Sequence, residues 1–264
     1  MWKDIIQTDL PRITPSSVGD LECSKKYWKL RVQKEWPKRE PLEAVAHGNA
    51  VHKVLRQVYL RRANSEPDMR NLRALAEGAV GGERYPEGYD HSRAVKRVID
   101  AVGGFVNSDD YEDVDGTIAL ERQVEFPFIR HGEPLYLVSA TLDRILVRAS
   151  RPTQLVVRDY KTTAQRINLQ EAFIILWVAK RAYPDFESYA LEYDWLDEEN
   201  RVKRDTIPGT QLRGQHRIIT EAAVRVLTAT EHHAEPGACC TYCPLRVECQ
   251  RLDPVEIEEG EEIF

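Results

Sequence analysis

Four of the five cysteines in this 264-residue chain lie in one short stretch near its C-terminal end. The stretch reads ACCTYCPLRVEC from residue 238 to residue 249, and the remaining thiol, Cys23, lies near the other end. Clustered cysteines in a reducing compartment are typical of metal-binding or catalytic sites rather than of disulfides. A site that combines Cys23 with the C-terminal thiols requires a fold that brings the two chain ends together.

Spacing indicates which thiols can share one centre. Cys240, Cys243 and Cys249 form a C-x₂-C-x₅-C pattern, whereas starting from Cys239 would leave a three-residue gap. Together with Cys23 they supply four thiolates, a ligand set that suits tetrahedral zinc and a 4Fe–4S cluster equally well. The residues alone leave both alternatives open, beside the simpler one of reduced thiols that bind nothing.

Composition indicates an ordinary soluble protein. Hydrophobic residues make up 42% of the chain and charged residues 30%, and the longest apolar run, FIILWVA, is too short to span a bilayer. The N-terminal residues lack the basic and then apolar pattern of a secretory signal. We therefore expect a cytoplasmic protein with no membrane partner, located in the host cytoplasm if the gene is carried by a phage.

The net charge of −6 is concentrated in a tail. Residues 253–264 hold six carboxylates and no basic residue, so the rest of the chain is neutral. One interpretation is a disordered, solubilising tail. The other is a mimic of nucleic acid, which lies in the protein's own basic groove or docks on a protein partner.

A basic segment lies beside Cys23. Residues 23–39 read CSKKYWKLRVQKEWPKR and interleave lysines and arginines with Tyr27, Trp28 and Trp36. Such a segment can follow a phosphate backbone and stack on bases. The plainer interpretation is a solvated helix face with core aromatic residues.

Hydrophobic periodicity predicts helices around a group of strands. Ser16 or Ser17 is expected to cap a helix that carries Cys23, and further helices are expected over residues 41–63, 92–108, 168–184 and 210–233. Strands are expected over residues 117–128, 135–148, 154–161 and 189–197. This order predicts one α/β or α+β domain over residues 1–252 with a helical N-terminal extension, followed by the tail.

The two middle strands carry a candidate catalytic group. A hairpin centred on Arg151 would place Asp143 opposite Asp159, with Lys161 on the same face as Asp159. Opposed carboxylates repel unless a cation lies between them or one is protonated, and oxygen ligands suit Mg²⁺ or Mn²⁺. With Lys161 beside a metal-bound water, this is the arrangement of metal-assisted phosphodiester hydrolysis. The plainer alternative is an edge hairpin with a surface Asp–Lys pair.

The order of these motifs resembles the PD-(D/E)XK nuclease superfamily. Within it, the chain is similar to the RecB- and AddB-like iron–sulfur exonucleases, a branch that includes small CRISPR-associated and phage exonucleases. The shared motifs are a cysteine-bearing helix, GNAVH at residues 48–52, an aspartate on a strand, DYK at residues 159–161, a helix beginning NLQ, and the C-terminal cysteines. The resemblance implies an α/β fold with a restriction-endonuclease-like core, a mixed sheet flanked by helices, and a C-terminal iron–sulfur segment.

The resemblance also implies a role for each matching residue. The implied metal ligands are His52, Asp143, Asp159 and Tyr160, the implied catalytic residues are Asp143, Asp159, Lys161 and Gln170, and the implied 4Fe–4S ligands are Cys23, Cys240, Cys243 and Cys249. Two positions depart from the family pattern, Ala140 in place of a glycine and Ile174 in place of a tyrosine. Neither departure removes a metal ligand.

We therefore expect a Mg²⁺- or Mn²⁺-dependent DNA exonuclease with a 4Fe–4S cluster. Its expected substrate is single-stranded DNA ends in recombination, repair or CRISPR-type processing. The alternative is a non-catalytic DNA-end-binding or assembly module that keeps the fold and the cluster.

Overall fold

A computed structural model describes residues 10–37, 42–62, 71–108, 116–162, 167–196, 202–237, 240 and 243–252. The acidic tail and Cys239 lie outside these described residues. The elements in chain order are β1 (Arg12–Ile13), the 3₁₀ helix η1 (Pro15–Glu22), α1 (Ser24–Tyr27), the π-helical turn η2 (Trp28–Val32), α2 (Glu43–Arg62), α3 (Leu72–Gly81), α4 (His91–Val106), β2 (Thr117–Arg130), β3 (Glu133–Arg148), β4 (Arg151–Lys161), α5 (Leu169–Ala182), β5 (Ser188–Leu196), β6 (Val202–Pro208), the 3₁₀ helix η5 (Gly209–Leu212), α6 (Gln215–Thr228) and α7 (Arg246–Leu252).

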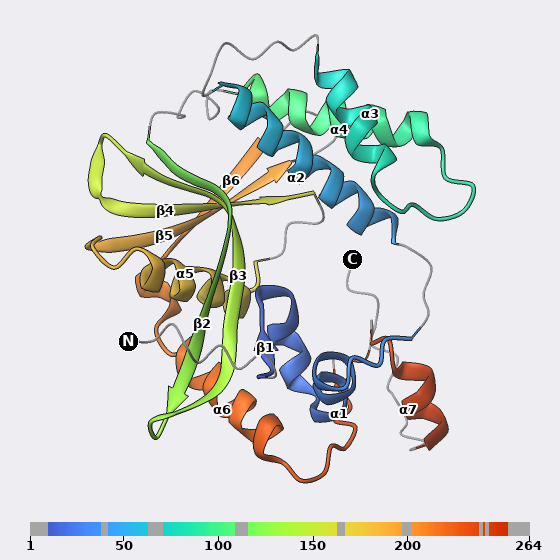
Figure 1. Ribbon diagram of the computed structural model, residues 1–264, viewed down its shortest axis with the longest axis vertical. Coiled ribbons are helices and arrows are strands. Elements are labelled where there is room, and N and C mark those ends of the chain that lie inside the picture. The colour runs from blue at the N-terminus through green and yellow to red at the C-terminus, as the bar shows by residue number, and fades with distance from the viewer. Residues whose placement is uncertain are drawn as a thin grey trace.

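A six-stranded mixed sheet lies at the centre of the fold (Figure 1). Its long strand β3 pairs antiparallel with β2 along one edge. The other edge of β3 is shared, because β1 runs parallel to it at Leu137 and Val138 while β4 runs antiparallel to it from Arg144 onward. β5 adds parallel to β4, and β6 adds antiparallel to β5. This mixed sheet flanked by helices is the predicted α/β architecture and is consistent with a restriction-endonuclease-like fold.

Helices cover the sheet in two groups. Residues of η1, α5 and α6 share one apolar core with β3, β4 and β5. Helices α2, α3 and α4 form a second core, which reaches the sheet through Tyr160 and Leu196. Figure 1 shows these three helices together at one end of the molecule. No helix in the described part of the chain is both long enough and apolar enough to cross a membrane.

Several element boundaries differ from the sequence prediction. Thr14, rather than Ser16 or Ser17, precedes the first helical turn, and its N–H donates to Ser17 Oγ at 2.7 Å. The expected helix over residues 210–233 is interrupted at Gly214, whose φ of 96° belongs to the left-handed region. Helix α3 and strand β6 were not predicted. β6 is a polar strand at the end of the sheet, where one-sided burial leaves little hydrophobic pattern.

The two ends of the chain meet in an end junction, formed by residues 24–29 with residues 232–248. The Ser24 N–H donates to Glu235 Oε1 at 3.0 Å, and the Lys25 N–H donates to the carbonyl of His233 at 3.1 Å. Trp28 stacks on His232 with ring centroids 4.1 Å apart. These contacts join segments more than 200 residues apart in the sequence, since the Ser24–Glu235 bond alone spans 211 positions.

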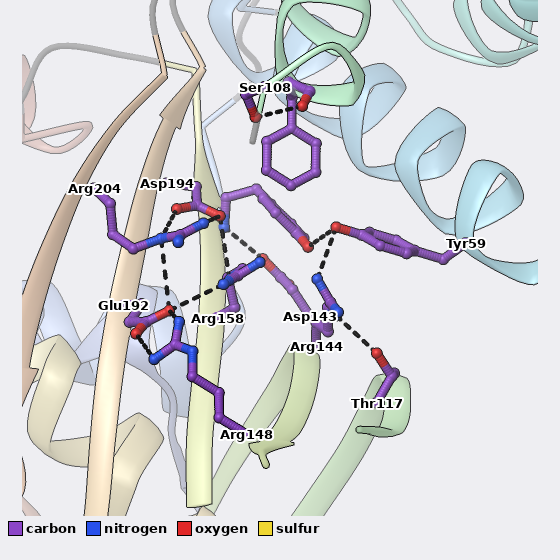
Figure 2. A network of polar contacts seen from close by, with 12 residues as sticks. Tyr59, Ser108, Thr117, Asp143, Arg144, Arg148, Arg158, Glu192, Asp194 and Arg204 are labelled. Carbon is purple, nitrogen blue, oxygen red and sulfur yellow. Dashed lines mark hydrogen bonds and ion pairs between the residues drawn. The ribbon is translucent and has the colours of Figure 1, made fainter. Parts of the chain in front are cut away.

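A buried ionic layer surrounds Arg158 in the sheet (Figure 2). Arg158 is fully buried and contacts Glu192 Oε2 at 3.2 Å and Asp194 Oδ2 at 3.3 Å. Arg148 donates two bonds to Glu192, at 2.6 and 2.8 Å. Arg204 donates to Asp194 at 2.7 Å. Because each carboxylate is shared between arginines, the layer ties β3, β4, β5 and β6 together.

Burial raises the pKa of Glu192, but Arg148, Arg158 and Arg204 outweigh it and bring the pKa below its usual value. Glu192→Gln leaves buried arginines facing a neutral amide, so we expect the free energy of unfolding to fall by about 3–5 kcal/mol. Urea denaturation measures this loss. The matched control is Glu221→Gln, which breaks an exposed pair with Arg217 and should change stability by about 0.5 kcal/mol or less. Equal small losses in both variants would contradict the prediction.

Candidate active site

The hairpin of β3 and β4 brings two carboxylates together. Arg144 pairs with Arg158 and Ile145 with Val157, and continuing this register by one position sets Asp143 across from Asp159. This is the register expected for a hairpin centred on Arg151. Both aspartates are buried, with exposed fractions of 7% and 8%. Two acids this close in a low-dielectric setting favour the binding of a cation.

His52 reaches the carboxylates from helix α2. Its Nδ1 lies 3.4 Å from Asp143 Oδ2, and its Nε2 lies 3.0 Å from the carbonyl oxygen of Tyr160. The same Asp143 oxygen accepts the Tyr160 N–H at 3.0 Å. Gly48 lies four residues before His52, and a Cβ there would come 3.3 Å from Thr162 Oγ1. The glycine therefore lets α2 approach the end of β4 closely.

Glu121 of β2 is a site residue that sequence reasoning missed. The β2–β3 register sets it across from Asp143, and its Oε1 lies 3.7 Å from His52 Nδ1. Its backbone φ of 48° lies in the left-handed region that residues other than glycine seldom adopt. Ligand atoms of His52, Glu121 and Asp143 all lie within 4.8 Å of one another. Two carboxylates and an imidazole converging in this way fit a divalent cation.

Lys161 and Asp159 form an ion pair at 2.8 Å between Nζ and Oδ2. Burial and then the charge of Asp143 raise the pKa of Asp159 to about 6, even though Lys161 and His52 act in the opposite direction. Burial lowers the pKa of Lys161, but Asp159, Glu171 and Asp143 together raise it above its usual value. Glu171, in the first turn of α5, is thus a second site residue that the sequence analysis did not identify. Lys161 is held as an ammonium among carboxylates.

The protonation of His52 depends on the same carboxylates. Burial lowers its pKa, but Asp143, Glu121 and Asp159 outweigh burial and raise the pKa well above the usual value. With no cation present, the imidazolium proton balances part of the negative charge. A divalent cation at this position would replace that proton.

Tyr160 and Gln170 are the remaining predicted site residues. The Tyr160 hydroxyl donates to Tyr59 Oη at 2.9 Å, and its ring meets that of His52 edge-on with centroids 6.1 Å apart, while its backbone carbonyl lies 3.0 Å from His52 Nε2. Gln170 is the second residue of α5 and is half-buried, with its N–H bound to Asn168 Oδ1 at 2.9 Å. The structure therefore places the main chain of Tyr160, but not its phenol, at the candidate metal position.

The four predicted cluster cysteines lie in, or directly beside, the two segments that form the end junction. Cys23 is buried, Cys240, Cys243 and Cys249 are partly buried, and all four are free thiols. Burial raises the pKa of Cys243, and the nearby thiols of Cys23 and Cys240 raise it further. Cys249 likewise interacts with Cys243 and Cys23. The fold thus brings thiols from both chain ends within electrostatic reach of one another.

Comparison with known proteins identifies the family. The family model of the PD-(D/E)XK nuclease superfamily matches residues 12–250, nearly the whole chain. The chain belongs to the PD-(D/E)XK nuclease superfamily. Among solved structures, it is similar to the crystal structure of SSO0001 at 13% identity, covering 89% of this chain and 96% of that one, with a TM-score of 0.38. That similarity is too low to support a functional argument. No curated protein matches the sequence.

Membership in this superfamily implies a nuclease that acts on DNA and typically uses divalent metal ions. His52, Glu121 and Asp143 are the described residues whose ligand atoms group closely enough to hold such an ion.

Metal binding distinguishes the roles of the two glutamates on β2. We expect Glu121→Gln to weaken Mn²⁺ binding by about tenfold or more, as loss of a supporting ligand does, and Asp143→Asn to abolish it. Isothermal titration calorimetry with Mn²⁺ alone measures both. The matched control is Glu125→Gln, on the same strand but paired with Arg12. Unchanged Mn²⁺ affinity in Glu121→Gln would exclude Glu121 from the metal site.

Proposed function

We propose that this protein is a metal-dependent DNA exonuclease of the RecB- and AddB-like iron–sulfur branch, acting on single-stranded ends. The observation that supports it best is the convergence of His52, Asp143, Asp159 and Lys161 from separate motifs into one group around two buried carboxylates. These are the residues that the resemblance to that branch singles out. The preference for single-stranded ends rests on the resemblance to that branch.

His52, Glu121 and Asp143, together with Asp159 and the Tyr160 carbonyl, would hold a Mg²⁺ or Mn²⁺ ion. Such an ion supplies a Lewis acid for the phosphate and lowers the pKa of a bound water. Asp143 and Asp159 are buried. Their attraction for a cation is therefore stronger than that of carboxylates surrounded by water.

Lys161 supplies the other part of the mechanism. Its side chain is 31% exposed, whereas that of Asp159 is 12% exposed, so the ammonium lies nearer to solvent than the carboxylate that holds it. A phosphate that approaches this face meets Nζ first. Lys161 Nζ can therefore donate a hydrogen bond to a phosphate oxygen or to the attacking water, while Asp159 fixes its position.

The cysteine site is proposed to hold a 4Fe–4S cluster. Four thiolates can hold either a zinc ion or a 4Fe–4S cluster. The choice of the cluster rests on the resemblance to the iron–sulfur branch.

Cleavage of labelled single-stranded DNA in the presence of Mn²⁺ tests the catalytic proposal. We expect activity that EDTA removes, and a loss of at least about a hundredfold in Lys161→Ala, because a positioned proton donor is lost. Lys96→Ala on α4, which breaks only an exposed pair with Asp100, is the control and should retain activity. Binding of DNA without any cleavage by the wild-type protein would instead support the non-catalytic end-binding module.

Colour and metal content test the cluster. Protein purified without oxygen should be brown and contain iron and sulfide, as expected for a thiolate-bound cluster. Cys23→Ala and Cys249→Ala should lose the colour and lower thermal stability, whereas Cys239→Ala should not. A colourless preparation with stoichiometric zinc would contradict the cluster assignment and leave the four thiolates as a zinc site.

A further inference from the structure

The three aromatic residues of the basic segment have different environments. Tyr27 is fully buried and its hydroxyl donates to the carbonyl of Arg12 at 3.0 Å, so it fits the interpretation as a core aromatic residue and cannot stack on a base. Trp28 is stacked on His232 in the end junction. Trp36 is 53% exposed. Of the three rings, that of Trp36 is therefore the one open enough to stack on a base.

Trp36 is held as a fixed platform. The Arg31 guanidinium lies 4.8 Å from the centre of the Trp36 ring and covers one of its faces. Arg31 is in turn held by the buried carboxylate of Asp20, with Nε and Nη2 both 2.8 Å from Oδ2. The backbone N–H of Trp36 donates to the carbonyl of Lys34 at 3.1 Å, and Lys34 itself has a left-handed φ of 59°. Only the second face of the ring remains for a ligand.

A groove of about 440 Å³ lies beside this platform. Leu30 and Val32 are among its apolar lining residues, and the polar ones include Arg12 and Lys34. Its size falls in the usual range for small-ligand sites, roughly 300–1,000 Å³. In the part of the chain that the structure describes, Lys34 has no ion-pair partner, and Arg12 is half-exposed beside Glu125. An apolar surface with an aromatic face and cations nearby matches a base attached to a phosphate.

The groove and the candidate active site lie along the same edge of β3. Arg12 and Ile13 of β1 pair with Leu137 and Val138, and β4 joins the same edge from Arg144. Asp143 lies five positions after Val138, about 17 Å along a strand at 3.3 Å per residue. A strand of DNA whose end lies at Asp143 would reach the groove within a few nucleotides.

We propose that this groove binds one nucleotide of the substrate strand, with its base stacked on Trp36 and its phosphate held by Lys34 and Arg12. The proposal rests on the proposed function and adds to it a positioning site outside the catalytic centre.

Binding of a fluorescent oligothymidylate, measured by polarisation in EDTA so that no cleavage occurs, tests the site. Trp36→Ala should weaken binding about tenfold, because base–aromatic stacking is lost, while Trp36→Phe should retain most of the affinity. Lys34→Asn removes the charge but keeps a residue that tolerates a left-handed φ. It should weaken binding and reduce the dependence of log affinity on log salt by about 0.7. Lys96→Ala is the control for general loss of charge.

An abasic oligonucleotide of the same length separates stacking from phosphate binding. On it, the effect of Trp36→Ala should disappear, whereas that of Lys34→Asn should persist. Unchanged oligothymidylate binding in Trp36→Ala, or an equal loss on the abasic strand, would overturn the subsite. If Trp36→Ala fails to unfold cooperatively, Trp36→Leu replaces it, since leucine keeps the apolar contact but cannot stack.

The wild-type protein separates this proposal from the proposed function. Cleavage by the wild type with no effect of the Trp36 and Lys34 variants would remove the subsite and leave the nuclease proposal standing. A wild-type protein that neither binds nor cleaves single-stranded DNA would overturn both.

Discussion

The register between β3 and β4 is the constraint on which the candidate site depends. Alternate residues of a strand face opposite sides of the sheet, so Arg144 and Arg158 face one side while their neighbours Asp143 and Asp159 face the candidate metal site. A slip of one residue would exchange arginines for carboxylates on both faces. Breaking a buried ion pair costs several kcal/mol, so the contacts of Arg158 with Glu192 strongly specify the register that builds the site.

Part of the candidate site was predictable from the sequence because two of its carboxylates lie on adjacent strands of one hairpin. The alternating pattern of these strands predicts Asp143 opposite Asp159, and the structure has this register, although the chain turns at residues 149–150 and the pairing shifts between Val147 and Arg148. Glu121 could not be predicted in the same way. Its strand has an irregular polar pattern, and nothing local tells whether Glu121 or Glu125 faces the site. The left-handed backbone at Glu121 is a tertiary outcome that no residue preference signals.

The basic segment shows a similar limit. Its composition predicts nucleic-acid contact for the whole segment, but the fold divides its aromatic residues between core, junction and surface. The division follows from a π-helical turn over Trp28–Val32 and the reversal at Lys34, which place Tyr27 and Trp36 on different sides. Periodicity at ordinary helical spacing cannot anticipate such a turn.

The end junction has a consequence for how the chain is made. The ion pair of Lys29 with Glu248 joins positions 219 residues apart, and Ser24 and Lys25 bind residues almost as far away. At about 5–20 residues per second, translation takes roughly 10–45 s to supply those partners. The hairpin that carries Asp143 and Asp159 is complete well before then. In a growing chain, the hairpin of β3 and β4 can therefore form before residues 24–29 have met their partners in residues 233–248.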